Sequence, residues 1–578
     1  MATWLVDFFT APILVFGLGM ARAMLGSLLV VDGARHLVDA DVWLNPDALG
    51  LRRRPSASGV WWRIVEMSWR PRVYLVAHCG FGVLLALGLG GSVPAGLAYL
   101  TFRRIHRANR YVLYGGDAVL RMAVLLLACS PCTASLSLDR WLTAGDLGVG
   151  VEAPPWGMRL LQIELAVLYF YNCWYKLAHA AWREGTAVFY PLNNADIRNH
   201  RLPIPRVFMT RPMVALGTWG TLALEFALGF GLWIAELRPS LLVCAVALHL
   251  AIAYAFSLWL FSYIMFGCLC VFIDPRWFFA IGEISIHAWG PQTSLGMILG
   301  LSVACAYVVF ALYWDPPHGS LVSRVIRERL GPLFRRIGMV RRWRLFSGNP
   351  PAGRLVTLVM TSTDGEGRIR KWGWNQTIGL FDEDPLLDKR TVWNHRLRKF
   401  ASSLLRVPDA QQRFGHYVLQ LARARGIDAR ALTVDARFDH LGHIDTGEPL
   451  EPIAHRNLFT YLAPVEDERP LTALACALGE RSRSPLCIDV LVYVGARSIA
   501  EGRSDLDTLA AIRLAAQTDW PTVADEEISV TRSFVIARIR DEQRRELYEG
   551  VLDALTGRGD WPSVIISIDR LMNRESAA

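Results

Sequence analysis

Apolar runs of membrane-span length fill the first 315 residues, whereas the remainder alternates short apolar and polar stretches. A bilayer core needs about 20 mostly apolar residues in a helix. The pattern therefore predicts an all-α polytopic membrane bundle of eight or nine transmembrane helices, followed by a smaller α+β soluble domain. The expected spans are about residues 11–31, 73–90, 92–102, 112–130, 158–178, 213–235, 239–257, 258–273 and 293–314. The seventh and eighth spans meet around Ala255 to Trp259 without a charged loop, which predicts a broken or re-entrant helix.

Strand and helix patterns alternate in the C-terminal part. Residues 355–361 and 368–374 flank the turn-forming run at 364–367, so we expect a hairpin there. Helices are expected at 392–405, 411–425 and 541–555, and further strands at 431–438, 487–494, 528–536 and 563–568. The resulting domains are a transmembrane domain at 1–320, a basic interfacial linker at 321–350 and an α+β domain at 351–578.

Composition agrees with a membrane protein: 53% of the residues are hydrophobic and 21 are tryptophan. The net charge of +9 comes largely from arginines in loops beside the spans, so it indicates a bilayer and not nucleic acid as partner. With nine spans these basic loops share one side, which the positive-inside rule places in the cytoplasm together with the C-terminal domain. The N-terminus has no basic region before its apolar run, so we expect an uncleaved anchor.

A polar stripe crosses the expected span that begins near Leu160. Gln162, Tyr169 and Lys176 are spaced by seven residues, and Asn172 precedes the lysine by one turn. An ionisable group at membrane depth is costly unless it faces a partner or a cavity inside the bundle. Lys176 therefore either points inward with the stripe or extends to the membrane interface. Taken alone, a desolvated lysine is expected to be neutral and basic, and its removal is expected to leave stability unchanged or raise it.

The chain has ten cysteines, most of them in or beside the spans, where small apolar packing is their ordinary role. Cys129 and Cys132 have the spacing of a redox pair at the end of a span, which leaves a thiol–disulfide role open. No cysteine–histidine cluster has the spacing of a metal site, and no nucleotide-binding or hydrolase motif is present.

Several short motifs, in this order, resemble a known family. They are NRYVLYGGD at 109–117 with Ser137-Leu138-Asp139, the Lys176 segment ending in WREGTA at 182–187, His249 followed by LFSYIM at 260–265 and Asp274-Pro275, and RWRLFSGNP at 342–350. Together they resemble the horizontally transferred transmembrane (HTTM) domain, the membrane core of vitamin K-dependent γ-glutamyl carboxylase and its bacterial relatives. The resemblance covers about residues 10–350.

The resemblance implies a function and a site. Lys176 matches the lysine that acts as base in the oxidation of a reduced quinone, and His249 would hydrogen-bond the quinol or its oxyanion. The implied cofactors are a reduced quinone (menaquinol or vitamin K hydroquinone), O2 and CO2, and the implied location is the bacterial inner membrane. The implied quinol cavity comprises Gln162, Tyr169, Asn172, Arg110, Asn109, Asp117, Trp182 and Tyr263.

One position departs from the family pattern. Arg110 stands where the carboxylase has a functional histidine, and a guanidinium stays protonated and does not exchange protons in that role. The preferred hypothesis is therefore a quinol-dependent, carboxylase-like membrane enzyme whose substrate is a peptide or small molecule. Two alternatives stay open: a non-catalytic membrane factor for peptide maturation or export, and a thiol–disulfide role of Cys129 and Cys132.

Overall fold

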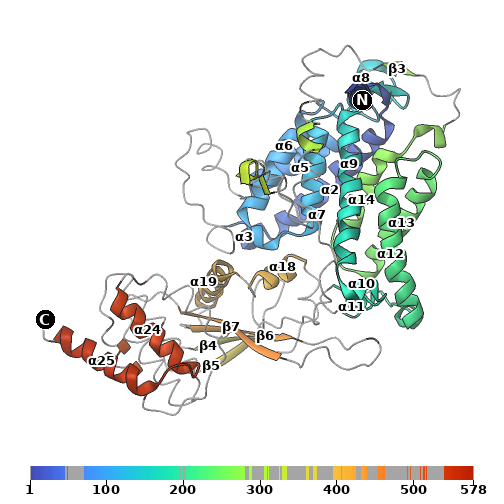
Figure 1. Cartoon of the computed structure of the whole chain (residues 1–578). Helices are drawn as coiled ribbons and strands as arrows, with labels where there is room; N and C mark the ends of the chain where they lie inside the picture. The colour runs from blue at the N-terminus through green and yellow to red at the C-terminus, as the bar shows by residue number, and fades with distance from the viewer. Residues whose placement is uncertain are drawn as a thin grey trace. The chain divides into compact units, whose positions relative to one another are not determined.

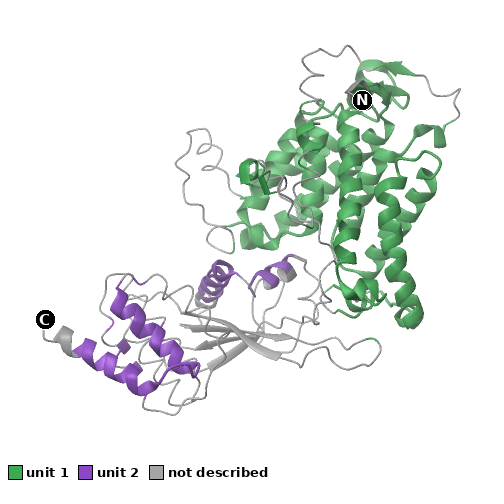
Figure 2. Ribbon diagram, viewed as in Figure 1, with its two compact units in different colours: residues 1–354, 440–451 green, residues 355–439, 452–578 purple. Residues whose placement is uncertain are grey.

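The computed structural model divides the chain into two compact units (Figures 1 and 2). Unit 1 comprises residues 1–354 and 440–451, and unit 2 comprises residues 355–439 and 452–578. The structure describes mainly residues 2–45, 71–194, 202–279, 359–363, 369–373, 395–404, 407–424, 431–438, 454–462 and 541–576, with isolated positions and short segments between them.

Unit 1 is a helical bundle. Its longer described helices are α2 (Phe16–Val38), α5 (Pro71–Leu87), α6 (Val93–Ala108), α7 (Gly115–Ala128), α9 (Trp156–Leu177), α12 (Arg211–Gly231), α13 (Arg238–Ala255) and α14 (Phe261–Leu269). Shorter helices include α1 (Ala2–Thr10), α3 (Ala40–Trp43), α8 (Leu138–Ala144), α10 (Ala180–Arg183) and α11 (Phe189–Asn193). In the bundle, α9 packs against α7, α12 and α14 (Figure 1).

A described helix overlaps each of the first eight expected spans, and most of the ninth falls outside the described residues. Three of these helices, α2, α12 and α13, are long and apolar enough to cross a membrane. Helix α9 is not among them, and it carries Arg159, Glu164 and Lys176. The protein is thus a helical membrane protein, while the total of eight or nine crossings stays a prediction.

The expected break between the seventh and eighth spans is confirmed. Helix α13 ends at Ala255 and α14 begins at Phe261. Between them Trp259 adopts a φ of 55°, a left-handed conformation that is uncommon for a bulky residue. Its indole Nε1 donates a hydrogen bond of 3.2 Å to Asp32 Oδ1 on α2, which ties this turn to the rest of the bundle.

Small residues allow α2 and α5 to approach closely. A Cβ added at Gly26 would lie 2.5 Å from the backbone nitrogen of Ala86, and one added at Gly33 would lie 2.6 Å from Cys79 Sγ. Such positions are common where membrane helices pack, because small side chains bring the two backbones into contact.

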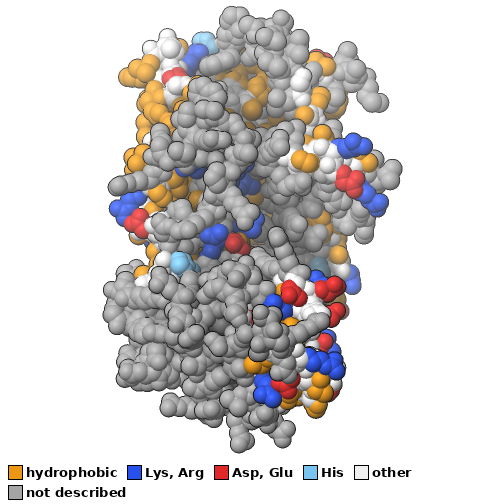
Figure 3. Space-filling view, turned by 90° about the vertical axis from the view of Figure 1, so that its left-hand side faces the viewer, with side chains coloured by type: hydrophobic (Ala, Val, Ile, Leu, Met, Phe, Trp, Pro, Cys, Tyr) orange, Lys and Arg blue, Asp and Glu red, His pale blue; other side chains and the backbone are white. Residues whose placement is uncertain are grey.

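The outer faces of the bundle are apolar. Exposed apolar side chains on α12 and α13 include Leu216, Trp219, Phe226, Phe230, Val243 and Leu250. Figure 3 shows hydrophobic side chains gathered on the surface of the helical part on the face seen there. Exposed apolar surface on this scale suits contact with lipid.

A small three-stranded sheet joins distant parts of unit 1. Strand β2 (Val151–Ala153) pairs antiparallel with β1 (Ile13–Leu14) and parallel with β3 (His287–Ala288). It fixes the loop that precedes α9 to the segment before α2, because Val15 N also donates to Val151 O.

Unit 2 contains an antiparallel sheet of order β5-β4-β6-β7, in agreement with the α+β prediction. Strands β4 (Val359–Thr363) and β5 (Ile369–Gly373) form the expected hairpin, and β6 is Ala431–Phe438. Helices α18 (His395–Leu404), α19 (Pro408–Ala424) and α24 (Glu542–Leu555) lie where helical periodicity placed them. Strand β7 (Ala454–Leu462) was not expected.

Two expected strands are wrong. Residues 563–568 belong to helix α25 (Trp561–Ser576). A run of β-branched residues favoured a strand, but Asp560 accepts a hydrogen bond of 3.0 Å from Ser563 N at the helix start. Val564 and Ile568 are buried one helical turn apart, whereas Ile566 is exposed, as in an amphipathic helix. In the range 487–494, the described residues Leu491 and Val492 are helical. The strand expected at 528–536 lies outside the described residues.

Candidate active site in the helical bundle

The polar stripe predicted on α9 is buried. Gln162, Tyr169, Asn172 and Lys176 are each at most 5% exposed. The inward orientation of Lys176 therefore replaces the alternative in which its ammonium extends to the membrane interface. The seven-residue spacing places these side chains on the face of α9 that packs against neighbouring helices.

Lys176 is held by a carboxylate from another helix. Its Nζ lies 2.5 Å from Oε1 of Glu225 on α12, and both side chains are buried. Asn172 Nδ2 donates to the same oxygen at 2.8 Å. The ammonium also lies 4.7 Å from the centre of the Trp182 ring, within range of a cation–π interaction. Lysine, carboxylate, amide and indole thus form one cluster, which we call the Lys176 cluster.

A second hydrogen-bonded pair lies on α9 one turn before Asn172 and about two turns before Lys176. The Tyr169 hydroxyl and His249 Nε2 on α13 are 2.9 Å apart, and both side chains are at most 3% exposed. The His249 ring also makes edge-to-face contacts with Phe261 and Phe266 on α14. These contacts fix the imidazole on the same side of α9 as the Lys176 cluster.

Three polar atoms at this site have no hydrogen-bond partner among the described residues. They are Oε2 of Glu225, Oδ1 of Asn172 and Nδ1 of His249, and each is buried. An unsatisfied buried polar atom costs about 1–3 kcal/mol. Such atoms in a native fold therefore point to a ligand or solvent that they bind.

The ion pair changes the expectation for Lys176. Its Nζ lies 2.5 Å from a carboxylate oxygen of Glu225, so Lys176 is one half of a buried pair and not an isolated side chain. The premise of an isolated desolvated lysine is wrong, and so is the stability effect inferred from it. Removing Lys176 leaves Glu225 as an unpaired buried carboxylate, which is strongly destabilising.

Glu225 was not singled out from the sequence, although a signal was present. It is the only acidic residue in the apolar run of α12, residues 211–231. A lone carboxylate inside a membrane helix marks a functional or paired position as plainly as a lone lysine does. The sequence does not show which cationic side chain, on which helix, Glu225 contacts.

The other residues of the implied cavity make different contacts. Gln162 donates to the Val271 backbone oxygen at 2.8 Å and accepts from Arg159 at 3.0 Å. Asn109 donates to the backbone oxygens of Trp43 and Leu49 and so stabilises the turn after α6.

Asp117 accepts from Tyr114 N at 3.0 Å as part of the capping box of α7. Arg110 is exposed and its guanidinium lies over the ring of Tyr111. Tyr263 is 46% exposed on α14. Of the ten residues proposed for catalysis or the quinol cavity, Tyr169, Asn172, Lys176, Trp182 and His249 come together at this site.

Cys129 and Cys132 are both free thiols. Burial raises the pKa of Cys132, in the loop after α7, to about 11. A thiol with so high a pKa is a poor nucleophile at neutral pH, which weighs against a thiol–disulfide role. Among the described residues, no group of three or more His, Cys, Asp or Glu side chains is placed to hold a metal ion.

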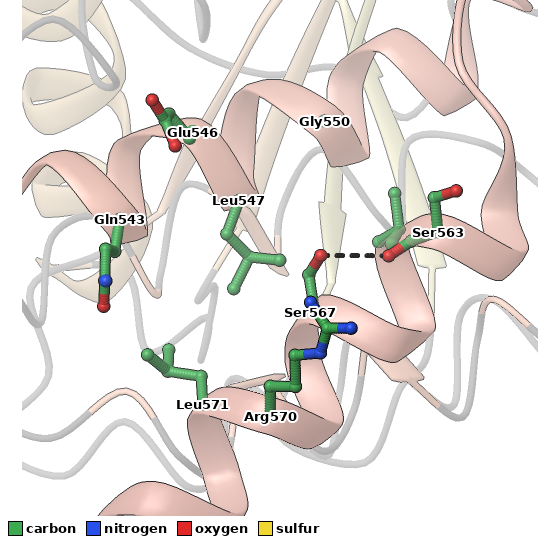
Figure 4. Close-up of a pocket in the computed structure, with 9 residues that line it drawn as sticks. Gln543, Glu546, Leu547, Gly550, Ser563, Ser567, Arg570 and Leu571 are labelled. Atoms are coloured by element: carbon green, nitrogen blue, oxygen red, sulfur yellow. Dashed lines mark hydrogen bonds between the residues drawn. The ribbon is translucent and has the colours of Figure 1, made fainter.

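A separate hollow of about 660 Å³ lies between α24 and α25 in unit 2 (Figure 4). Leu547 and Leu571 line it together with Arg570 and the hydrogen-bonded Ser563 and Ser567. None of the residues predicted for the site lines it.

Comparisons with known proteins give a family for part of unit 1 and one partial relative. Residues 12–277 match the family model described as the HTTM domain. The chain is 32% identical over 119 residues to the Bacillus subtilis (strain 168) protein named "Uncharacterized protein YitO". That alignment covers 20% of this chain and 38% of the Bacillus protein. No solved structure matches.

Proposed function

Residues 12–277 form an HTTM domain, which relates the chain to a carboxylase-like membrane family, and we propose on this premise that the protein is a quinol-dependent membrane enzyme. It would couple oxidation of a reduced quinone to modification of a peptide or small substrate. The observation that carries the proposal is the buried Lys176 cluster, one turn from the Tyr169–His249 pair.

The arrangement supports the proposal, because it holds groups that could move a proton and stabilise an oxyanion during oxidation of a quinol. Removing a hydroxyl proton needs an acid–base group at the reacting atom, and the Lys176–Glu225 pair supplies one. The oxyanion that remains needs a donor held in place, and the Tyr169–His249 pair has one N–H or O–H left after its mutual hydrogen bond. The apolar surroundings limit access of water to a reactive anion, and the bilayer delivers a lipid-soluble substrate directly.

The second half-reaction depends on which substrate proton the activated oxygen species removes and on what traps the carbanion that is left. In the carboxylase family, carbon dioxide traps a substrate carbanion, and we extend that step here only as an expectation. Arg110 stands at the position of a family histidine and is exposed. Arg110→His is therefore expected to leave quinol oxidation intact and to test whether carboxylation is gained.

The test uses the purified full chain in lipid nanodiscs with menaquinol and oxygen, followed by chromatography of the quinone epoxide. Wild type is expected to form the epoxide, and Lys176→Ala to form none. Lys399→Ala, the same replacement on α18 in unit 2, is the matched control and should keep full activity.

Two outcomes would contradict the proposal. Epoxide formation by Lys176→Ala at the wild-type rate would remove the lysine from the chemistry. Absence of the epoxide in folded wild type would favour the non-catalytic alternative, in which the domain binds a peptide for maturation or export.

A further inference from the structure

Within the proposed quinol site, we infer that Glu225 is the residue that receives the hydroxyl proton and selects the reduced form of the headgroup. This inference rests on the proposed function and assigns roles inside it. Lys176 then acts on Glu225 as a positioning residue that holds the carboxylate through Oε1.

The two oxygens of Glu225 differ in their surroundings. Oε1 accepts from Lys176 Nζ at 2.5 Å and from Asn172 Nδ2 at 2.8 Å. Oε2 is buried and has no partner among the described residues. The carboxylate is therefore anchored through one oxygen and leaves the lone pairs of the other for a ligand.

The side-chain amide of Asn172 likewise has one atom in a hydrogen bond and one without a described partner. Its Nδ2 is used on Glu225, so its Oδ1 is fixed as an acceptor, and this atom too is buried without a described partner. The cluster thus offers two acceptors, from groups that are joined by one hydrogen bond. Two buried acceptors are satisfied by a ligand that donates hydrogen bonds.

This requirement distinguishes the two redox states of a quinone. A hydroquinone presents a hydroxyl donor at either end of its ring, whereas the oxidised quinone has only carbonyl acceptors, whose lone pairs would face the lone pairs of these acceptors. Each buried acceptor left unsatisfied costs about 1–3 kcal/mol, so the reduced form is bound preferentially.

The proton step follows from the same contacts. The ligand O–H bond breaks, an O–H bond forms at Glu225 Oε2, and the electron pair stays on the ligand oxygen as an oxyanion. A carboxylate has the lone pair for this step, whereas an ammonium paired with that carboxylate has none. The ammonium at Oε1 instead holds the carboxylate in place.

The experiment compares three probes bound anaerobically to the full chain in nanodiscs, with tryptophan fluorescence as the readout: 2-methyl-1,4-naphthalenediol, its dimethyl ether and 2-methyl-1,4-naphthoquinone. Wild type is expected to bind the diol at least about tenfold more tightly than the other two, the value of one hydrogen bond.

Glu225→Gln replaces an acceptor oxygen by an amide that can present a donor. The diol-to-quinone preference is expected to fall at least about tenfold and to move towards the quinone. Asn172→Leu, which keeps the Lys176–Glu225 pair, should also reduce the preference. Glu236→Gln, in the exposed turn after α12, is the matched control and should retain it.

An unchanged preference in folded Glu225→Gln and Asn172→Leu overturns the inference. So does a wild type that binds none of the probes, or that does not distinguish the diol from its ether. Epoxide formation is measured separately. Epoxide formation by a protein that shows no preference for the diol would contradict this inference alone. A preference for the diol without any quinol oxidation would contradict the proposed function alone.

Discussion

The Lys176–Glu225 ion pair makes a prediction about stability that differs in sign from the one that burial of a lone lysine suggests. The perturbations are Lys176→Met, Glu225→Leu and the double substitution, which keep side-chain volume while removing charge. Each single variant leaves one buried charge without its partner, and the double variant leaves none.

The magnitudes follow from the geometry. At 2.5 Å and an effective dielectric constant of about 20, the Coulomb attraction is about 7 kcal/mol. Desolvation costs several kcal/mol for each ion, so the pair as a whole contributes little relative to an apolar pair. Breaking the pair from one side removes the attraction and keeps the remaining desolvation cost, for a loss of about 3–5 kcal/mol in each single variant. The double variant is expected within about 1–2 kcal/mol of wild type, or above it.

The assay is reversible unfolding in mixed detergent and denaturant micelles, followed by tryptophan fluorescence, for all four proteins of the cycle. The expected result is strong non-additivity, with the double variant more stable than either single variant. The reasoning would be refuted if each single variant lost less than about 1 kcal/mol of unfolding free energy. It would also be refuted if the loss in the double variant equalled the sum of the losses in the two single variants. The first result would mean that the pair is not held in the dry interior that its burial indicates.

Three further predictions concern the site, the thiols and the packing. His249→Ala should lower quinol oxidation about a hundred- to a thousandfold without abolishing it, because one oxyanion hydrogen bond contributes about 3–4 kcal/mol to the barrier; a wild-type rate would contradict the role. Iodoacetamide should alkylate Cys132 in the folded protein only slowly at pH 8 and faster as the pH rises towards its pKa of about 11; rapid alkylation at neutral pH would restore the thiol hypothesis. Gly26→Ala should destabilise the protein by about 1–3 kcal/mol, since the new Cβ meets the α5 backbone. Gly80→Ala on α5, where a Cβ meets nothing within 4 Å, should leave thermal stability unchanged or slightly higher.

Local sequence patterns predicted much of the secondary structure. Apolar runs placed the membrane helices, and the missing charge around Ala255 to Trp259 predicted the break between α13 and α14. The hairpin β4–β5 was predictable because a turn and two alternating strands are adjacent in sequence. These features depend on residues close along the chain.

Other elements depended on tertiary context. Strand β7 adds to β6 by pairing from Ala431↔Leu462 to Phe438↔Ala454, a partnership across an intervening segment that no local pattern specifies. The run at 563–568 is rich in β-branched residues, yet it forms α25, because packing against α24 and the Asp560 cap outweigh a weak intrinsic preference.

The same division holds at the site. The seven-residue spacing of Gln162, Tyr169 and Lys176 is a property of one helix, so the sequence by itself determined that they share a face. It did not determine that Lys176 meets Glu225, 49 residues further along, or that Tyr169 meets His249, 80 residues further along. Those pairings are set by which helices pack side by side, and packing also decides whether a buried lysine is a lone base or half of an ion pair. Charge interactions fall off with distance in space and take no account of separation along the chain, so only the tertiary structure decides which charged and polar groups the stripe meets.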